Sequence, residues 1–376
     1  MNKLFKCIYK GKKVFVTGHT GFKGSWLCIW LIELGADVIG YSLEPPSIPN
    51  NFKASNLESK ITHIYGDIRD FEHLREVFEK YKPEIVFHLA AQPLVRLSYE
   101  EPKQTFDTNV GGTANVLEAL RVTPYVHAFV NVTSDKCYEN KEWVWGYREQ
   151  DPMGGYDPYS ASKGCAELVF EAYHRSFFTD ELSGERKIGV ASVRAGNAIG
   201  GGDWGLDRII PDCIRALSKK ESIGIRHPEA IRPWQHVLEP LSGYLWLGAL
   251  LIKDPGKYSG AWNFGPQYQS TRTVQELVES FINLWGSGRW THVSTIEAKP
   301  VHEASFLKLC CDKAHAYLKW RGCLNFEEAL QLTVRWYKDY YQQNPPPDMY
   351  KRCAAQIREY VQVAQRQGLV WANYEN

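Results

Sequence analysis

The sequence predicts an α/β protein built on a doubly wound parallel sheet of about seven strands, with a smaller α/β domain toward the C-terminal end. Three observations support this prediction. Short runs rich in β-branched and aromatic residues alternate with longer amphipathic runs. The short runs are apolar almost throughout, which is typical of parallel strands buried on both faces. The first of them ends in a glycine-rich turn that leads into a helix-like pattern.

The first element is expected as a strand over residues 13–17, because Lys-Val-Phe-Val-Thr is rich in β-formers and stops at Gly18. Apolar residues then recur with helical spacing from Trp26 to Leu34, and Gly35 ends that run. Six further strands are expected at 37–41, 62–65, 84–89, 128–132, 188–193 and 260–265. Helical patterns lie between most of them, most clearly at 74–80, 108–121 and 160–177.

After Arg194 the regular alternation breaks down. Gly200–Gly202 and Pro211 interrupt the next segment, and the last hundred residues read as helices with glycine and proline breaks, ending in a helix at 354–367. We therefore expect a nucleotide-binding domain at 1–195 that also takes in a returning segment near 236–265. The remaining segments, 196–235 and 266–376, are expected to form the second domain.

Composition restricts the class of protein. With 376 residues the chain is long enough for one large or two closely packed domains, and its net charge of +1 gives no general attraction to nucleic acid or to an anionic membrane. The nine cysteines include no Cys-x-x-Cys pair, which favours reduced thiols over a zinc site or a disulfide framework. We find no signal-peptide core and no apolar run near the roughly 20 residues of a membrane span. We expect a cytoplasmic protein with no bound metal, no nucleic-acid partner and no membrane association.

The glycine-rich turn has the spacing Gly18-x-x-Gly21-x-x-Gly24. In a Rossmann-type turn the first glycine permits the sharp bend, the second lets the backbone approach a pyrophosphate, and the third lets helix and strand pack closely. The helix N-terminus then offers N–H groups and positive partial charge to the phosphates. An ordinary strand-to-helix turn is the alternative, but the position between a strand and a helix favours dinucleotide binding.

The nucleotide type is less strongly indicated. Ser42 stands at the end of the second strand, where a carboxylate that binds the adenosine ribose is typical. A serine hydroxyl can still form a hydrogen bond with the 2′-hydroxyl of NAD, but it repels the 2′-phosphate of NADP less than a carboxylate would. NAD is therefore favoured, and NADP is not excluded. Asp67 ends the third strand, where it is expected either to accept from the adenine amino group or to cap the next segment.

Tyr159 and Lys163 are four residues apart and share one face of a predicted helix. A nearby ammonium stabilises a phenolate, so we expect Lys163 to lower the pKa of Tyr159 from about 10 toward neutrality. Such a phenolate takes a proton from a substrate hydroxyl while hydride leaves the same carbon. Ser134, after the fifth strand, is placed to bond that hydroxyl. His88 is expected to be a packed strand residue. A Tyr-x-x-x-Lys pair is often an exposed pair of surface residues with no function, but its position after the glycine-rich turn favours catalysis.

In this order, these motifs resemble the extended short-chain dehydrogenase/reductases of the sugar-nucleotide branch, over roughly residues 12 to 340. The resemblance implies a seven-stranded sheet that binds NAD(P) and a C-terminal domain for the sugar nucleotide. It implies cofactor contacts from the turn, from the strand ends and from the catalytic pair. These residues are Gly18, Thr20, Gly21, Phe22, Lys23, Gly24, Ser42, Asp67, Ile68, Leu89, Ala90, Ala91, Thr108, Tyr159 and Lys163. Asn109 is expected to be structural.

Ser134-Asp135-Lys136 distinguishes between members of this branch. Epimerases need only the Tyr, the Lys and a Ser or Thr, whereas 4,6-dehydratases carry an acid and a base directly after that Ser or Thr. The pair Asp135-Lys136 resembles the dehydratases whose substrate is CDP-glucose. The resemblance implies that Asp135 protonates the departing 6-hydroxyl and that Lys136 removes the C5 proton, which requires a neutral amine. Stabilisation of an enolate by Lys136 is the alternative.

The substrate diphosphate requires cations, and Arg208 and Arg232 are the candidates because arginine matches phosphate geometry. The resemblance adds Gln92, Asn197 and His302 as candidate substrate contacts. Arg194, Trp234 and His236 are expected to be structural. A homodimer or homotetramer is expected through the helices at 108–121 and 160–177. The alternatives are a dTDP- or GDP-sugar dehydratase, a 4-epimerase and a non-enzymatic NAD(P)-binding regulator, and the last is disfavoured because Tyr159 and Lys163 are both present.

Overall fold

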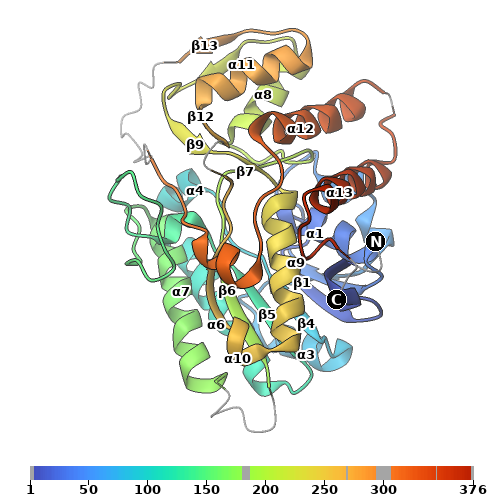
Figure 1. Ribbon diagram of the computed structural model, residues 1–376, viewed down its shortest axis with the longest axis vertical. Helices are drawn as coiled ribbons and strands as arrows, with labels where there is room; N and C mark the ends of the chain where they lie inside the picture. Colours follow the sequence, from blue (N-terminus) through green and yellow to red (C-terminus); the bar gives the residue numbers. More distant parts are fainter. Residues whose placement is uncertain (1–3, 180–186, 268–269, 294–305, 344, 374–376) are drawn as a thin grey trace.

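The computed structural model describes residues 4–179, 187–267, 270–293, 306–343 and 345–373. Its centre is a parallel sheet of seven strands in the order β11-β6-β5-β4-β1-β2-β3 (Figure 1). The strands are β1 (Lys13–Thr17), β2 (Asp37–Ser42), β3 (Thr62–Tyr65), β4 (Ile85–His88), β5 (Ala128–Val132), β6 (Gly189–Arg194) and β11 (Gly260–Asn263). Each falls on an expected segment, so the predicted α/β fold is confirmed.

The strand order reverses beside β1, which pairs with β2 on one side and with β4 on the other. Thr17, the last residue of β1, lies opposite Tyr41 and His88 in the register. In an open α/β sheet, ligands bind outside the carboxyl ends of the strands at such a switch point. The glycine-rich turn that follows Thr17 therefore lies where the topology itself favours a ligand.

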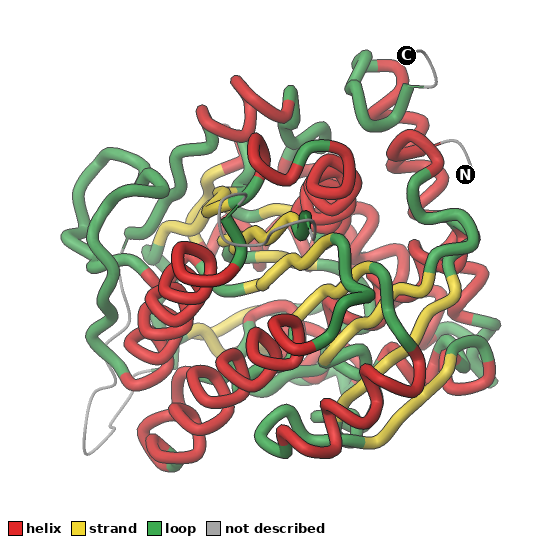
Figure 2. Tube along the Cα trace, turned by 90° about the horizontal axis from the view of Figure 1, so that it is seen from below, coloured by secondary structure: helices red, strands yellow, loops and turns green. Residues whose placement is uncertain are grey.

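Helices cover both faces of the sheet, as Figure 2 shows from below. One face carries α3 (Phe71–Tyr81), α6 (Gly112–Val122) and α7 (Pro158–Phe177), and the other carries α1 (Phe22–Glu33), α9 (Leu238–Lys253) and α13 (Met349–Arg366). The alternation of side chains along β1 divides the core accordingly. Val14 and Val16 belong to the apolar cluster around α1 and α9, whereas Phe15 belongs to the cluster around α3, α6 and α7.

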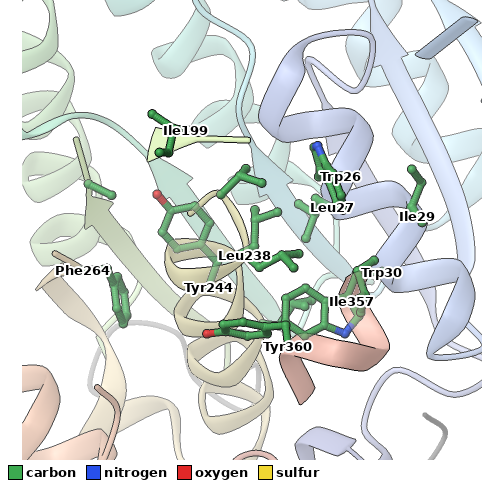
Figure 3. Packing of buried hydrophobic residues seen from close by; sticks show 14 of the residues in the cluster. Trp26, Leu27, Ile29, Trp30, Ile199, Leu238, Tyr244, Phe264, Ile357 and Tyr360 are labelled. Atoms are coloured by element: carbon green, nitrogen blue, oxygen red, sulfur yellow. The ribbon is translucent and has the colours of Figure 1, made fainter. Parts of the chain in front are cut away.

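Helix α9 is buried along almost its whole length, from Leu238 to Leu251. Figure 3 shows the side chains of Leu238 and Tyr244 on this helix among residues of α1 and α13, including Trp30 and Tyr360. A helix that is apolar on all sides is typical of a position enclosed by other elements. Its one buried carboxylate, Glu239, accepts hydrogen bonds from the backbone N–H groups of Cys323 and Leu324 and from Tyr360.

The elements after β6 gather mainly at the carboxyl end of the sheet (Figure 1). They include α8 (Ile209–Ser218), α11 (Val274–Trp285), α12 (Phe326–Tyr341) and the strand pairs β7 (Ala198–Ile199) with β10 (Gln235–His236), β9 (Ile231–Pro233) with β12 (Thr271–Thr273), and β8 (Ile223–Ile225) with β13 (Trp290–His292). The short elements are η1 (Leu4–Cys7), α2 (Asn51–Ala54), η2 (Leu57–Ser59), α4 (Val95–Glu100), α5 (Pro102–Phe106), η4 (Asp135–Cys137), α10 (Pro255–Tyr258) and η6 (Ala314–Leu318). The division into domains at residue 195 stays a prediction.

One expected helix differs in the structure. The segment 108–121 begins with a π-helical turn, η3 (Asp107–Gly111), and continues as α6. Within the turn, the amide of Asn109 accepts from the backbone N–H of Gln92 and donates to its carbonyl and to Ser162. These bonds tie the turn to the loop after β4 and to α7. Asn109 is thus structural, as expected.

The two ends of the described chain pack against each other. The backbone N–H of Phe5 donates to the carbonyl of Trp371, and the two rings stack with centroids 5.2 Å apart and an interplanar angle of 8°. Trp30 on α1 meets both rings edge-on. The lead-in to β1 is therefore completed by residues from the far end of the sequence.

Candidate functional site

The glycine-rich turn has no room for side chains at two of its glycines. Gly18 has φ +72°, and a Cβ placed on it would lie 2.7 Å from the backbone nitrogen of Ala90. A Cβ on Gly24 would collide with the carbonyl oxygen of Gly18. Gly21 is the N-cap of α1. The turn is therefore packed so closely against the loop after β4 and against α1 that only glycine fits at these two positions, as in a turn that binds the pyrophosphate of a dinucleotide.

The next strand ends complete this side of the site. The hydroxyl of Ser42 lies 2.9 Å from that of Thr20, and Thr20 also donates to the carbonyl of Leu43. Asp67 accepts from the backbone N–H of Arg69 and forms an ion pair with its guanidinium. Burial opposes ionisation of Asp67, but the hydrogen bonds and charge of Arg69 outweigh it and lower the pKa of this carboxyl. Asp67 thus bonds within its own turn, whereas the N-cap of α3 is Asp70, and the expected role of Asp67 toward the adenine stays a prediction.

The imidazole of His19, in the turn itself, lies against β2 and β3. It packs on Gly40, and its Nε2 lies 2.7 Å from Nδ1 of His63 on β3. Burial and the neighbouring His63 lower the pKa of His19 to about 3, so it is neutral at physiological pH. His19 thus supports the turn from below.

The end of β4 is held by polar contacts within the core. Thr17 Oγ1 accepts from the N–H groups of Leu89 and Ala90 and lies 2.7 Å from Nδ1 of His88. His88 is buried, and burial together with the charge of Lys163 lowers its pKa to about 3. It is a packed strand residue, as expected. The side chain of Gln92 bonds Thr105 and its own loop, which orders the loop that carries Leu89–Ala91.

Tyr159 and Lys163 lie in the first two turns of α7. Asp157 caps this helix by accepting from the N–H and the hydroxyl of Ser160, and Pro158 occupies the first helical position. Tyr159 is further fixed by a bond from its backbone N–H to Ser98. Both the phenol and the ammonium are buried. The helix start therefore places the expected catalytic pair on one buried face.

The expected effect of Lys163 on Tyr159 is wrong for the free protein. Burial raises the pKa of Tyr159 to about 12, because a phenolate loses more hydration than a phenol. A hydrogen bond from Ser134 and the charge of Arg208 oppose this rise, and the charge of Asp135 adds to it. Burial also lowers the pKa of Lys163 to about 8, and the charge of Lys23 lowers it further. Burial, which the two side chains share, is the largest influence on both pKa values, and their spacing along the helix does not predict it.

Lys23 is the unexpected member of the site. The sequence suggested only a cofactor contact, but its ammonium interacts electrostatically with Asp135, Arg208 and Lys163. Burial lowers the pKa of Lys23 to about 8, an effect that Arg208 increases and Asp135 opposes. The second residue of α1 thus brings an additional cation to the catalytic group. The sequence carried a signal only in the Phe22-Lys23 pair inside the turn.

Asp135 is the first residue of η4, three positions after the end of β5, and is buried. Its carboxylate accepts from Ser134 at 2.9 Å and from Asn197 Nδ2 at 3.4 Å, and it packs so closely on Gly196 that a side chain at that position would collide with it. A small cavity adjoins Asp135, lined by Gly196, Asn197, Pro233, Gln235, Gly265, Pro266 and Leu309. Lys136 is partly exposed, and its backbone N–H donates to Ser134.

A buried ion pair holds α7 against the sheet behind the catalytic groups. Arg194 Nη2 lies 2.9 Å from Glu167, and each side chain is 4% exposed. Arg194 also donates to Tyr138 and to the carbonyl of Glu149. Although burial favours the neutral acid, the charge and hydrogen bond of Arg194 lower the pKa of Glu167. Arg194 is structural, as expected, and Trp234 and His236 are likewise buried.

The candidate substrate residues are distributed unevenly. Asn197, with φ +49°, bonds Asp135, and Arg208 forms an ion pair with Asp203 at 3.0 Å while interacting electrostatically with Tyr159. Arg232 lies on β9 opposite Arg272 on β12, and its Nη1 donates to the carbonyl of Ile231. Gln92 is engaged within its own loop. His302 lies outside the described residues. All of these assignments stay predictions.

Among the residues that the structure describes, no helix has the length and apolar character needed to cross a membrane. Nor does that part of the chain bring together three or more His, Cys, Asp or Glu side chains that suit a metal ion.

The fold and the site together define a short-chain dehydrogenase/reductase of the extended type, with a dinucleotide turn, a Tyr-x-x-x-Lys pair and a Ser-Asp-Lys triplet around one switch point. The family described as GDP-mannose 4,6 dehydratase matches residues 15–333, and the chain belongs to this family. The family resemblance seen in the sequence is thereby confirmed.

Two individual proteins in this comparison are sugar-nucleotide 4,6-dehydratases. The chain is 52% identical over 334 residues to the CDP-glucose 4,6-dehydratase of Salmonella typhimurium, which covers 89% of this chain and 92% of the relative. It is 25% identical over 346 residues to the dTDP-glucose 4,6-dehydratase of Haemophilus influenzae, covering 86% and 97%.

Solved structures agree on the fold. The dTDP-glucose 4,6-dehydratase of Bacillus anthracis in complex with NAD superposes with a TM-score of 0.72 at 22% identity, covering 90% of this chain and 100% of that one. The UDP-glucose 4-epimerase of Thermotoga maritima gives 0.73 at 24% identity, covering 87% and 99%. At this identity the likeness establishes the fold alone.

Proposed function

We propose that this protein is a CDP-glucose 4,6-dehydratase, a lyase that converts CDP-D-glucose into CDP-4-dehydro-6-deoxy-D-glucose and water. The observation that carries the proposal is the placement of Asp135. Its buried carboxylate accepts a hydrogen bond from Ser134, and both Ser134 and Asp135 act on the pKa of Tyr159, so an acid lies close to the phenol that takes the substrate proton. A 4-epimerase has no use for an acid at this position. The Salmonella typhimurium relative at 52% identity supports CDP-glucose as the substrate.

The expected cofactor is NAD, and the residues present fit it. The bare backbone at Gly18, Gly21 and Gly24 would receive the pyrophosphate, Ser42 the adenosine ribose, and Tyr159 with Lys163 the nicotinamide end. When bound, NAD accepts hydride from C4 of the glucosyl unit and returns it to C6, so none is consumed. The remaining cofactor contacts predicted from the sequence, among them Thr20, Phe22 and Thr108, belong to this proposal.

Each catalytic side chain has one proton to hold or to move. Tyr159 takes the proton of the C4 hydroxyl, and Ser134 bonds the same oxygen. A 4-keto group acidifies the C5 proton, which Lys136 removes. Asp135 gives its proton to the departing 6-hydroxyl, which leaves as water, and C5 is reprotonated after hydride reaches C6. The alternative for Lys136 is to stabilise the enolate with its positive charge.

The electrostatics explain why several cations are needed. A phenol whose pKa is raised to about 12 by burial releases its proton only with help. Arg208 lowers the pKa of Tyr159, and Lys163 and Lys23 add positive charge on the side of α7 and α1. Arg208 and Arg232 are proposed to bind the diphosphate, and Gln92, Asn197 and His302 to contact the sugar nucleotide.

We also propose a setting for this reaction. The product is an early intermediate of deoxysugars such as those of lipopolysaccharide O-antigen, and the enzyme acts in the cytoplasm. The outer surface of α6 and α7 exposes Val122, Leu168 and Phe177. These exposed apolar side chains support a homodimer or homotetramer in which α6 and α7 pack against a second copy of the chain.

The test uses CDP-glucose deuterated at C4, with catalytic NAD in ordinary water and mass spectrometry of the product. Loss of one water with deuterium retained at C6 is the expected result. Unchanged mass with inversion at C4 would instead establish an epimerase. Turnover of dTDP- or GDP-glucose alone would overturn the CDP assignment. The Asp135→Asn variant is the matched control, because it is expected to slow water loss while C4 oxidation continues.

A further inference from the structure

The loop Asp203–Arg208 connects the core to the catalytic group. At its base, the N–H of Asp203 donates to Tyr337, whose hydroxyl also donates to the carbonyl of Asp203, and the ring of Trp204 packs among the aromatic side chains of α12. At its end stands Arg208, which precedes α8 as the N-cap residue. One end of the loop is therefore fixed to α12, and the other carries a guanidinium that interacts with Tyr159.

Asp207, directly before Arg208, bridges two distant parts of the fold. Its Oδ1 lies 3.6 Å from Nε of Arg96 on α4 and 3.5 Å from Nη1 of Arg226, which follows β8. Helix α4 belongs to the loop after β4 at the carboxyl edge of the sheet, whereas Arg226 belongs to the elements beyond β6. A single carboxylate thus joins both sides of the site and offsets the repulsion between two guanidinium groups.

The backbone at Asp207 shows why this residue fixes the loop. Asp207 has φ +57°, a left-handed conformation that a non-glycine residue adopts at a cost. The two ion pairs offset that cost and set the direction in which residue 208 leaves. Arg208 then folds back over the loop, with its side chain packed beside Gly205 and its guanidinium paired with Asp203.

We propose that Asp207 is a positioning residue that acts through Arg208: held between Arg96 and Arg226, it fixes the loop so that Arg208, paired with Asp203, presents its guanidinium to the substrate diphosphate. This inference rests on the proposed function, because it gives Arg208 a sugar nucleotide to bind. The three side chains are one-quarter to less than one-half exposed, so their pairing is screened by salt but not abolished.

The test compares steady-state constants for CDP-glucose in Asp207→Asn, Arg208→Gln and the double variant. Asp207→Asn removes the carboxylate between Arg96 and Arg226, and KM is expected to rise about five- to tenfold, with a smaller fall in kcat because Arg208 also lowers the pKa of Tyr159. In the Arg208→Gln background, Asp207→Asn is expected to add no further rise in KM. An equal rise in both backgrounds would overturn the proposal, as would an unchanged KM in the single variant.

Two comparisons separate charge from loss of structure. Arg96→Lys keeps a cation near Asp207 and should hold KM within about twofold of the wild type, whereas Arg96→Gln, which keeps only the pair of Asp207 with Arg226, should raise KM by less than Asp207→Asn does. Glu359→Gln breaks the exposed ion pair with Arg335 between α13 and α12 and serves as the matched control. A rise in KM with Glu359→Gln, or a failure of Arg96→Lys to preserve KM, would contradict the positioning role.

A readout that needs no turnover distinguishes this proposal from the proposed function. Hydrogen exchange of the amides at 205–208 is expected to quicken in Asp207→Asn and not in Glu359→Gln. If the wild type does not turn over CDP-glucose, the proposed function fails, and the exchange measurement still decides the positioning of the loop. Unchanged exchange in Asp207→Asn would overturn the inference even in an active enzyme.

Discussion

Glu239 on α9 gives a stability prediction whose size follows from the structure. Its carboxylate is 2% exposed, and its oxygens accept from Cys323 N at 2.9 Å, from Leu324 N at 2.6 Å and from Tyr360 Oη at 2.8 Å. Glu239→Ala leaves two buried backbone N–H groups without an acceptor. At about 1–3 kcal/mol each, we expect a loss of about 4 kcal/mol in the free energy of unfolding.

Glu239→Gln should lower the free energy of unfolding far less, because an amide NH₂ group can take the place of Oε2, the oxygen that accepts from Tyr360. The amide carbonyl can accept from both backbone N–H groups, and the amide nitrogen can donate to Tyr360. The Tyr360 hydroxyl then donates to Ser242, 3.0 Å away, which it already contacts. We expect a change within about 1 kcal/mol, since every donor retains an acceptor.

The same geometry makes stability depend on pH. Burial raises the pKa of Glu239 to about 7 from its ordinary 4.5, and hydrogen bonds from Leu324 and Tyr360 oppose the rise. Because the folded state holds this proton more tightly, the free energy of unfolding falls as pH rises from about 4.5 through 7, and then levels off. Between pH 5.5 and 8 the fall is about 2 kcal/mol. Glu239→Gln lacks this dependence.

Urea unfolding of the wild type and both variants, followed by tryptophan fluorescence at pH 5.5, 6.5 and 8, checks the reasoning. Glu239→Gln should gain on the wild type as pH rises, and Glu239→Ala should be the least stable at every pH. Equal losses for Gln and Ala at pH 8 would show that the network requires a negative charge. Parallel curves for the wild type and Glu239→Gln would refute the raised pKa.

Three further predictions concern the site. Tyr159→Phe removes the proton acceptor for the C4 hydroxyl and should lower kcat by about 10²–10⁴-fold while NAD binding, measured by fluorescence titration, persists; near-normal turnover would exclude Tyr159 as the base. Burial and Lys23 lower the pKa of Lys163 to about 8, so kcat/KM should fall as pH rises through 8, and Lys23→Met should move this alkaline limb to higher pH; a limb that stays in place would show that Lys23 does not act on Lys163. Arg194→Met leaves the buried carboxylate of Glu167 without its partner and should lower the free energy of unfolding, measured with urea, by about 3–5 kcal/mol. The double variant Arg194→Met with Glu167→Met should recover much of this loss. Equal losses in the single and double variants would mean that packing, and not charge, causes the effect.

The sheet was predictable because its inner strands are buried on both faces. Runs such as Val14–Val16 and Val86–Phe87 are apolar for that reason, and the chain order of motifs then places the turn at the switch point. The π-helical turn at Asp107–Gly111 was not predictable, because its apolar spacing matches an α-helix. Its cause, the amide of Asn109 bonded to the loop after β4, is a tertiary contact.

The residue types of the site were also predictable, but their electrostatics were not. Spacing along α7 puts Lys163 on the same face as Tyr159 but says nothing of how deeply the pair is buried, and burial decides both pKa values. The approach of Lys23 to Asp135, and the bridge from Asp207 to Arg96 and Arg226, join residues more than a hundred positions apart in most cases. No local sequence pattern predicts contacts between residues so far apart in the chain.

The stacking of Phe5 on Trp371 has a consequence for the order of folding. Phe5 precedes every strand of the sheet in the sequence, whereas Trp371 follows the last of them. Residues 5–7 adopt left-handed backbone angles, which are costly outside glycine. That conformation therefore lacks its stacking partner until all seven strands of the sheet have been synthesised. The segment that leads into β1 should thus be among the last parts of this fold to order, even though it comes before the sheet in the sequence.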